Sequence, residues 1–138
     1  MASVFTRIID GELPGHFVWR DDRCVAFLSI NPLRHGHTLV VPIAEVDHWL
    51  DLDPDLAAHL MVVAQRVGAA QQVAFDPLRV GLMVAGLEVP HVHLHVVPIW
   101  GVADLDFANA EASPDPAALE RAAEAIRSAL GEGQHPSP

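Results

Sequence analysis

The chain has 138 residues, which suffices for one domain with a buried core, and its 51% hydrophobic and 19% charged residues are typical of a globular fold. Its formal net charge of −10 argues against a polynucleotide or an anionic membrane surface as a partner, although local groups can still bind a small anion. All eight basic residues are arginine, so neither a P-loop lysine nor Schiff-base chemistry is available.

The N-terminal part predicts a short helix followed by three strands. Apolar residues within 5–9 predict one or two helical turns, which end before Gly11. Runs of β-branched and aromatic residues then predict strands at 17–20, 23–30 and 38–42.

A long amphipathic helix is predicted next. Asp53 supplies an N-cap and Pro54 a first helical residue, and apolar residues then recur every three or four positions until 76–77. Met61 and Val62 lie outside this apolar stripe. Their excess apolar surface predicts a subunit interface, and we expect a homodimer.

Two further strands and a last helix complete the predicted elements. The strands lie at 79–85 and 92–98. Ser113-Pro114 predicts the start of the C-terminal helix, and Gly131 predicts its end.

These elements predict a single α+β domain at 1–131, with a five-stranded, mainly antiparallel sheet and the helices on one face. Residues 132–138 are predicted to be a frayed tail. Cys24 is the single cysteine and has no CxxC partner, which favours a cytoplasmic protein. No apolar run is long enough for a membrane span.

Three alternating histidines, His91, His93 and His95, are the strongest candidates for chemistry. In a strand the side-chain period is two, so all three would point to one face. Such a face could be a solvated polar surface, a metal site or a site of phosphoryl chemistry. An imidazole is a competent nucleophile toward phosphorus near neutral pH, whereas a metal site would need further ligands that the sequence does not identify.

The sequence resembles the bacterial type of the histidine triad (HIT) family. The resemblance lies in four blocks that occur in the family's order, at 4–14, 22–28, 32–42 and 91–98. It implies a HIT-like fold, a homodimer and a purine nucleotide as the small-molecule partner.

The resemblance also implies a reaction. His93 would attack the α-phosphorus and form a nucleotidyl-histidine intermediate, His91 and His95 would flank it, and His37 would complete the polar cluster. The implied base and ribose pocket consists of apolar residues that could equally belong to the core, together with a serine where the family usually has a ribose-binding acid: Phe5, Ile8, Leu13, Phe27, Ile30 and Ser29.

The segment before the histidines departs from the family, which usually has a Gln and a hydroxyl residue where this chain has Leu87 and Glu88. Glu88 could protonate the leaving group if its pKa is raised, or repel anionic leaving groups if it stays ionised. It could also be a solvated loop carboxylate. We therefore expect the part of the site that contacts the leaving group to differ from that of other family members.

The resulting hypothesis is a nucleotide hydrolase or nucleotidyl transferase that acts on a nucleoside phosphoramidate or a dinucleoside polyphosphate. The alternative is a nucleotide-binding regulator with little turnover. No cofactor is expected. Some bacterial family members hold zinc with cysteines near the N-terminus, and because residues 3–6 contain none, no structural metal is expected.

Overall fold

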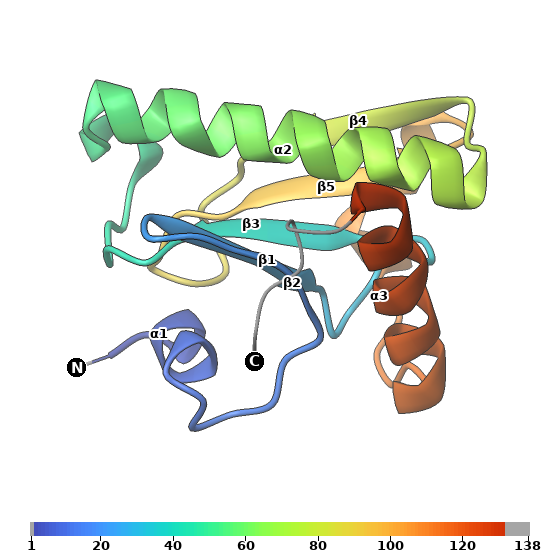
Figure 1. Cartoon of the computed structure of the whole chain (residues 1–138), viewed down its shortest axis with the longest axis horizontal. Helices are drawn as coiled ribbons and strands as arrows, with labels where there is room; N and C mark the ends of the chain where they lie inside the picture. The colour runs from blue at the N-terminus through green and yellow to red at the C-terminus, as the bar shows by residue number, and fades with distance from the viewer. Residues whose placement is uncertain (1, 132–138) are drawn as a thin grey trace.

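A five-stranded sheet forms the middle of the structure, a computed structural model that describes residues 2–131 (Figure 1). The strands lie in the order β1-β2-β3-β5-β4, and every neighbouring pair is antiparallel. The predicted α+β class with five strands is confirmed, whereas the predicted tail at 132–138 lies outside the described residues. The strands are β1 (Phe17–Arg20), β2 (Cys24–Leu28), β3 (Thr38–Pro42), β4 (Arg79–Met83) and β5 (Leu94–Ile99), and the helices are α1 (Val4–Ile9), α2 (Pro54–Phe75) and α3 (Pro116–Leu130).

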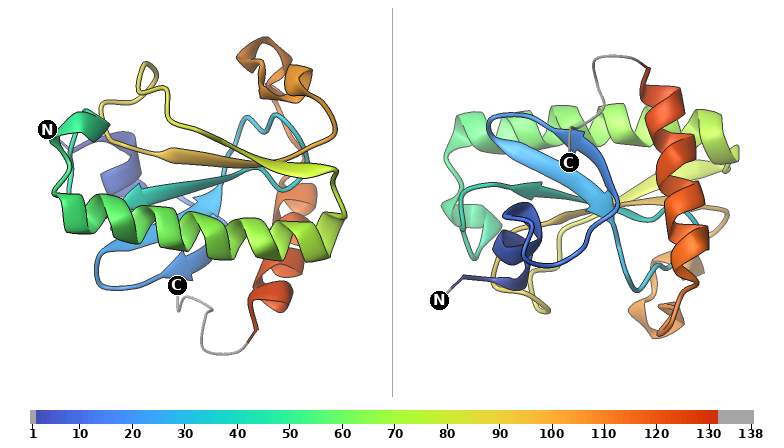
Figure 2. Two further views of the ribbon diagram at one scale, coloured as in Figure 1. Left: turned by 90° about the horizontal axis from the view of Figure 1, so that it is seen from above. Right: turned by 60° about the horizontal axis from the view of Figure 1, so that its bottom comes forward.

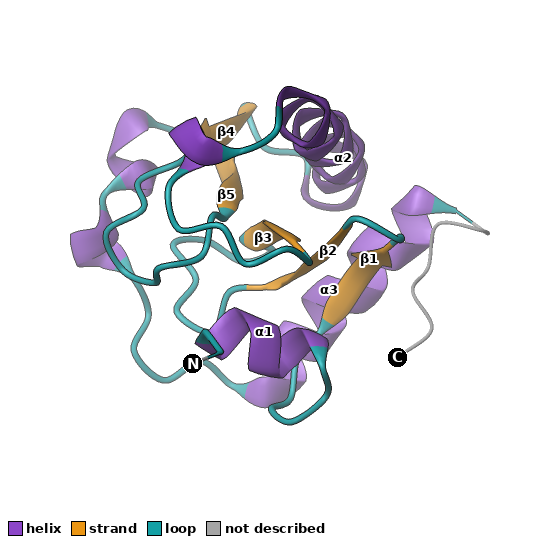
Figure 3. Cartoon of the chain, turned by 90° about the vertical axis from the view of Figure 1, so that its left-hand side faces the viewer, coloured by secondary structure: helices purple, strands orange, loops and turns teal. Residues whose placement is uncertain are grey.

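The two faces of the sheet are buried by different helices. α2 lies along one face and α3 packs on the β1–β2 end of it, as the two further views in Figure 2 show. α1 lies on the opposite face (Figure 3), where Phe5 packs against Phe27 and Leu39. The expectation that all helices share one face is therefore wrong for α1. Successive residues of a strand point to opposite faces, so β2 supplies both cores and is buried throughout.

The long helix α2 begins and ends where the sequence predicts. Asp53 caps it by accepting a hydrogen bond from the Asp55 backbone N–H, and Pro54 occupies the first turn. It ends at Phe75, where Asp76 adopts a left-handed conformation with φ of 49°. Among the described residues, no helix is long and apolar enough to cross a membrane.

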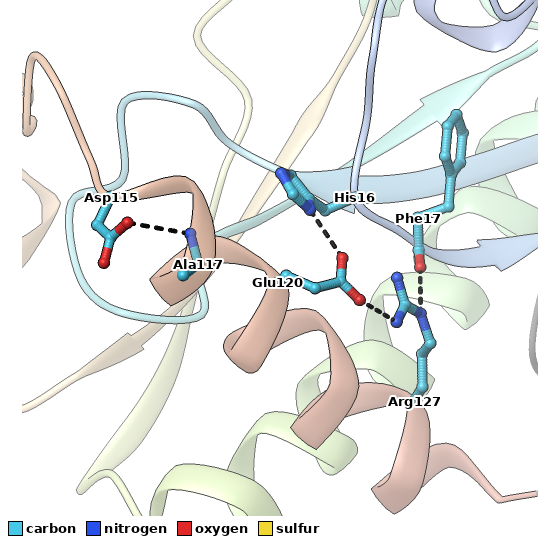
Figure 4. A network of polar contacts seen from close by, with 6 residues as sticks. All are labelled: His16, Phe17, Asp115, Ala117, Glu120 and Arg127. Atoms are coloured by element: carbon cyan, nitrogen blue, oxygen red, sulfur yellow. Dashed lines mark hydrogen bonds and ion pairs between the residues drawn. The ribbon is translucent and has the colours of Figure 1, made fainter.

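The C-terminal helix begins two residues later than predicted. Asp115, not Ser113, is its cap, and the Asp115 carboxylate accepts a hydrogen bond from the Ala117 N–H (Figure 4). Glu120 lies 2.8 Å from Nη1 of Arg127, which donates from Nε to the Phe17 carbonyl oxygen at 2.7 Å. These contacts connect α3 to the first residue of β1.

The histidine-rich strand is shorter than predicted. β5 begins at Leu94, so His91 and His93 lie in the preceding loop and only His95 belongs to the ladder. The alternation nevertheless continues through the loop, since Val92 and Leu94 join the core beneath α2 while the three histidines are buried on the other side. Strand pairing therefore fixes His95 alone. His91 and His93 are held by a backbone hydrogen bond from the Val92 N–H to the Val46 carbonyl oxygen and by hydrogen bonds of their own rings.

Candidate active site

A cavity of about 350 Å³ lies on the α1 face of the sheet. His93 and His95 line it, whereas His91 lies behind them and does not reach it. Leu13 and Leu87 do not line it either, and the Leu87 side chain is 93% exposed. The other sequence-predicted site residues all line the cavity: Phe5, Ile8, Phe27, Ser29, Ile30, His37 and Glu88.

Several further residues of the cavity were not predicted. Phe107 comes from a 3-10 turn after β5, and its ring centre lies 5.2 Å from that of His95. Asn31 joins the same wall by donating from its side-chain amide to the Glu111 carbonyl oxygen. No periodic pattern marks either residue, because both lie in irregular segments whose position depends on tertiary contacts.

The His93 ring is oriented by the backbone of His91, two residues earlier. Its Nδ1 lies 2.8 Å from the carbonyl oxygen of His91. A carbonyl oxygen only accepts, so Nδ1 carries the proton. In the neutral ring the lone pair is then on Nε2, the nitrogen nearest the Glu88 carboxylate of the cavity wall, and this is the arrangement that a nucleophilic imidazole needs.

His37 and His95 form a hydrogen-bonded relay that ends in the cavity. The Leu33 backbone N–H donates to Nδ1 of His37 at 3.0 Å, so the neutral His37 carries its proton on Nε2. That nitrogen lies 2.9 Å from Nδ1 of His95, which must accept, and the proton of His95 is therefore on Nε2. Within the described residues this buried Nε2 has no hydrogen-bond partner. The Leu33 backbone N–H thus sets the tautomers of both rings and leaves the Nε2–H of His95 as an unpaired donor in the cavity.

Burial keeps the relay neutral. It lowers the pKa of His37 to about 3, with further lowering by His95 and His93. Burial and the neighbouring His93 lower the pKa of His95 to about 4, although Glu88 acts in the opposite direction. At neutral pH both rings are uncharged, so the tautomer assignment holds.

His91 connects the cavity wall to α1. Its Nε2 donates to the Pro42 carbonyl oxygen at 2.8 Å, and its Nδ1 accepts from the Ser3 hydroxyl at 2.6 Å. Glu45 accepts from the Ser3 N–H and from the Thr6 hydroxyl. Burial lowers the pKa of His91, so this ring is also neutral. His91 therefore connects α1 and β3 to the segment that carries His93 and His95. Its contacts are structural, since the ring does not reach the cavity.

Gln71 supports the relay from the opposite face of the sheet. This fully buried side chain of α2 donates to the carbonyl oxygens of Gly36 and Val96. Gly36 has a φ of +94°, and a Cβ built there would lie 2.4 Å from the Phe75 ring. The sequence does carry a signal for Gln71, because this amide lies four residues after Val67, in register with the apolar stripe.

Glu88 approaches both reactive nitrogens. Its Oε1 lies 3.5 Å from Nε2 of His93 and 3.6 Å from Nε2 of His95. These three atoms could hold a metal ion by their spacing. Ligation by His95 would need a lone pair on Nε2, where the relay places a proton. With a proton on Nε2 of His95, the space between the two histidines and Glu88 fits an anion better than a metal cation.

A second mixed cluster lies away from the cavity, at Asp21, Cys24 and His59. Burial raises the pKa of Asp21, but hydrogen bonds from Trp19, from the backbone and from His59 outweigh this effect and lower it to about 2. Burial also raises the pKa of the Cys24 thiol. Through these hydrogen bonds the Asp21 carboxylate connects the β1–β2 turn to His59 of α2.

Comparison with known proteins gives a consistent result. A family model described as HIT domain matches residues 10–100. A HIT-like protein of Methanocaldococcus jannaschii is 37% identical over 99 residues, which cover 69% of this chain and 77% of that protein.

Solved structures agree over nearly the whole chain. A hypothetical histidine triad nucleotide-binding protein of Sulfolobus tokodaii is 28% identical and superposes with a TM-score of 0.82, covering 92% of this chain and 91% of that one. A zinc-bound histidine triad family protein of Mycobacterium smegmatis is 29% identical with a TM-score of 0.80, covering 94% of each chain.

Proposed function

Because this chain belongs to the histidine triad family, we propose that it is a nucleotide hydrolase or nucleotidyl transferase. The substrate would be a purine nucleoside phosphoramidate or a dinucleoside polyphosphate, attacked at the α-phosphate by Nε2 of His93. The observation that carries this proposal is the proton pattern of the cavity. His93 presents a lone pair on Nε2, and the neighbouring His95 presents an N–H on its own Nε2, in the same part of the cavity.

The apolar part of the cavity supports binding of a nucleoside. Aromatic and aliphatic side chains from α1 and β2 line it, and the Phe5 and Phe27 rings meet edge to face at 5.6 Å. A flat base can bury its faces on such walls. The Ser29 hydroxyl, in place of a carboxylate, offers the ribose one polar contact. We therefore expect weaker ribose binding than an acidic residue would give.

The reaction would proceed in two balanced steps. In the first, a bond forms between Nε2 of His93 and phosphorus, and the bond to the leaving group breaks as that group takes up a proton from solvent water. Nε2–H of His95 donates to a non-bridging oxygen, on which negative charge develops. In the second, water bonds to phosphorus, loses a proton to solvent and releases His93 as a neutral imidazole.

The test measures AMP release from adenosine phosphoramidate and from diadenosine polyphosphate by the wild type and by His93→Ala. We expect turnover that falls by at least about a thousandfold in the variant, because the nucleophile is lost. AMP binding by the variant should remain, since the ring lies in the cavity wall. Wild-type AMP binding without turnover would instead favour the nucleotide-binding regulator.

We also propose a homodimer that forms through β4 and α2. β4 is an edge strand, and Leu82 on it is 41% exposed beside a groove that Met61 and Gly68 of α2 also line. An open, apolar edge favours pairing with a second copy. Light scattering should give twice the chain mass for the wild type and a smaller mass for Leu82→Glu. A wild-type mass of one chain would refute the dimer.

A cytoplasmic location belongs to the same proposal. Cys24 is buried and free, which suits a compartment that keeps thiols reduced. Cell fractionation with an antibody would test it, and recovery in a secreted fraction would contradict it.

A further inference from the structure

Glu88 lies where a substrate phosphate would have to be. An attacking nitrogen must come within about 3–3.5 Å of phosphorus. The Glu88 Oε1 atom already lies 3.5 Å from Nε2 of His93 and 3.6 Å from the N–H of His95. Its carboxylate and the α-phosphate of a nucleotide therefore compete for one position and one hydrogen-bond donor.

Within the part of the chain that the structure describes, no lysine or arginine lines the cavity to compensate for a second anion there. Among the described residues that line the cavity, Glu88 is the only aspartate, glutamate, lysine or arginine. A carboxylate and a phosphate that share a partly dry site repel each other more strongly than in water. Binding of a nucleotide therefore requires that Glu88 move aside.

The loop around Glu88 allows such a movement. Gly86 has a φ of +78° and no atom within 4 Å of the place of a Cβ, and Leu87 is almost fully exposed. The Glu88 side chain is 48% exposed, so its carboxylate can turn into solvent. Val89 packs on the α1 core and fixes the end of the loop. Glu88 and Val89 both line the cavity, so a carboxylate that turns toward solvent stays close to it. In-line attack by His93 would send the leaving group out on the side of phosphorus away from His93, toward solvent.

We propose that Glu88 determines specificity for the leaving group. This inference rests on the proposed function. It states that the site prefers amine leaving groups that carry a positive charge over phosphate leaving groups. A carboxylate at the mouth attracts an ammonium group and repels a polyphosphate. The same carboxylate weakens binding of the AMP product by competing with its phosphate.

The kinetic test compares three adenylate substrates that differ in the leaving group: ethylenediamine, propylamine and a second nucleotide's polyphosphate. The variants are Glu88→Gln and the control Glu124→Gln, which makes the same charge change on the exposed side of α3. We expect Glu88→Gln to lower the kcat/KM ratio of ethylenediamine to polyphosphate substrate at least about tenfold, which corresponds to about 1.4 kcal/mol. The control should keep the wild-type ratio, and an unchanged ratio in Glu88→Gln would overturn the inference.

A binding test does not depend on turnover. Calorimetric titration with AMP should show that Glu88→Gln binds at least about tenfold more tightly than the wild type, while Glu124→Gln binds like the wild type. Equal affinities in wild type and Glu88→Gln would refute the competition between carboxylate and phosphate. If the wild type binds AMP but turns over no substrate, the proposed enzyme is refuted, and this titration still decides whether the Glu88 carboxylate competes with a bound phosphate.

Discussion

Replacing His37 tests whether the relay sets the tautomer of His95. Asparagine places its side-chain oxygen near the position of Nδ1, so His37→Asn keeps the acceptor for the Leu33 N–H and leaves Nδ1 of His95 without a donor. Glutamine places its amide nitrogen near the position of Nε2, so His37→Gln keeps the donor and leaves the Leu33 N–H unpaired.

The two substitutions should cost similar stability. Each leaves one buried polar atom unpaired, which costs about 1–3 kcal/mol, and each removes part of a fully buried ring. Urea denaturation should therefore give similar losses in the free energy of unfolding for His37→Asn and His37→Gln.

The two substitutions should differ in turnover. In His37→Asn, the His95 ring is free to carry its proton on Nδ1, and the donor aimed at the phosphate is lost in that tautomer. One such donor is worth about 10²–10³ in kcat, so we expect His37→Asn to be at least about tenfold slower than His37→Gln. The assay is kcat for AMP release well below the unfolding temperature. Equal rates for two equally stable variants would refute the relay.

Three further predictions follow from the same contacts. The pKa values of His37 and His95, about 3 and about 4, lie below the ordinary histidine value of 6.5, so the unfolded chain binds more protons between these values. The free energy of unfolding should therefore fall as pH decreases from about 6.5 to 4, by up to about 1.4 kcal/mol per pH unit per histidine, and a flat urea-melt profile would contradict this. Gly36→Ala should lower stability by about 1–3 kcal/mol in the same melts because of its positive φ and the contact with Phe75, and unchanged stability would contradict the clash. EDTA should leave AMP release unchanged, whereas turnover that disappears with chelator and returns with zinc would assign the histidines to a metal.

The regular elements could be predicted because their signals are local. An unbroken apolar run marks β2, which is buried throughout, and the Asp53-Pro54 pair marks the start of α2. The start of α3 was misplaced by two residues because Ser113 and Asp115 are both good caps that precede a proline. The position of α1 was wrong because a helix of two turns carries no signal for the sheet face that it covers.

The site could be predicted only in part. Its residue types follow from the histidine pattern and the family resemblance, yet the proton positions depend on the Leu33 N–H and on the Pro42 carbonyl oxygen, which have no sequence signature. The position of Glu88 beside His93 depends on a loop conformation, which sequence patterns do not specify.

The covalent intermediate on His93 is the most direct test of the account. Wild-type protein should be mixed with adenosine phosphoramidate for one turnover, quenched in alkali to preserve an acid-labile phosphorus–nitrogen bond, and digested after arginine for tandem mass spectrometry. The account predicts one adenylate on His93 within the peptide at 80–121 and none in His93→Ala. Adenylate on His95 or on another residue, or substrate turnover in His93→Ala at the wild-type rate, would contradict it.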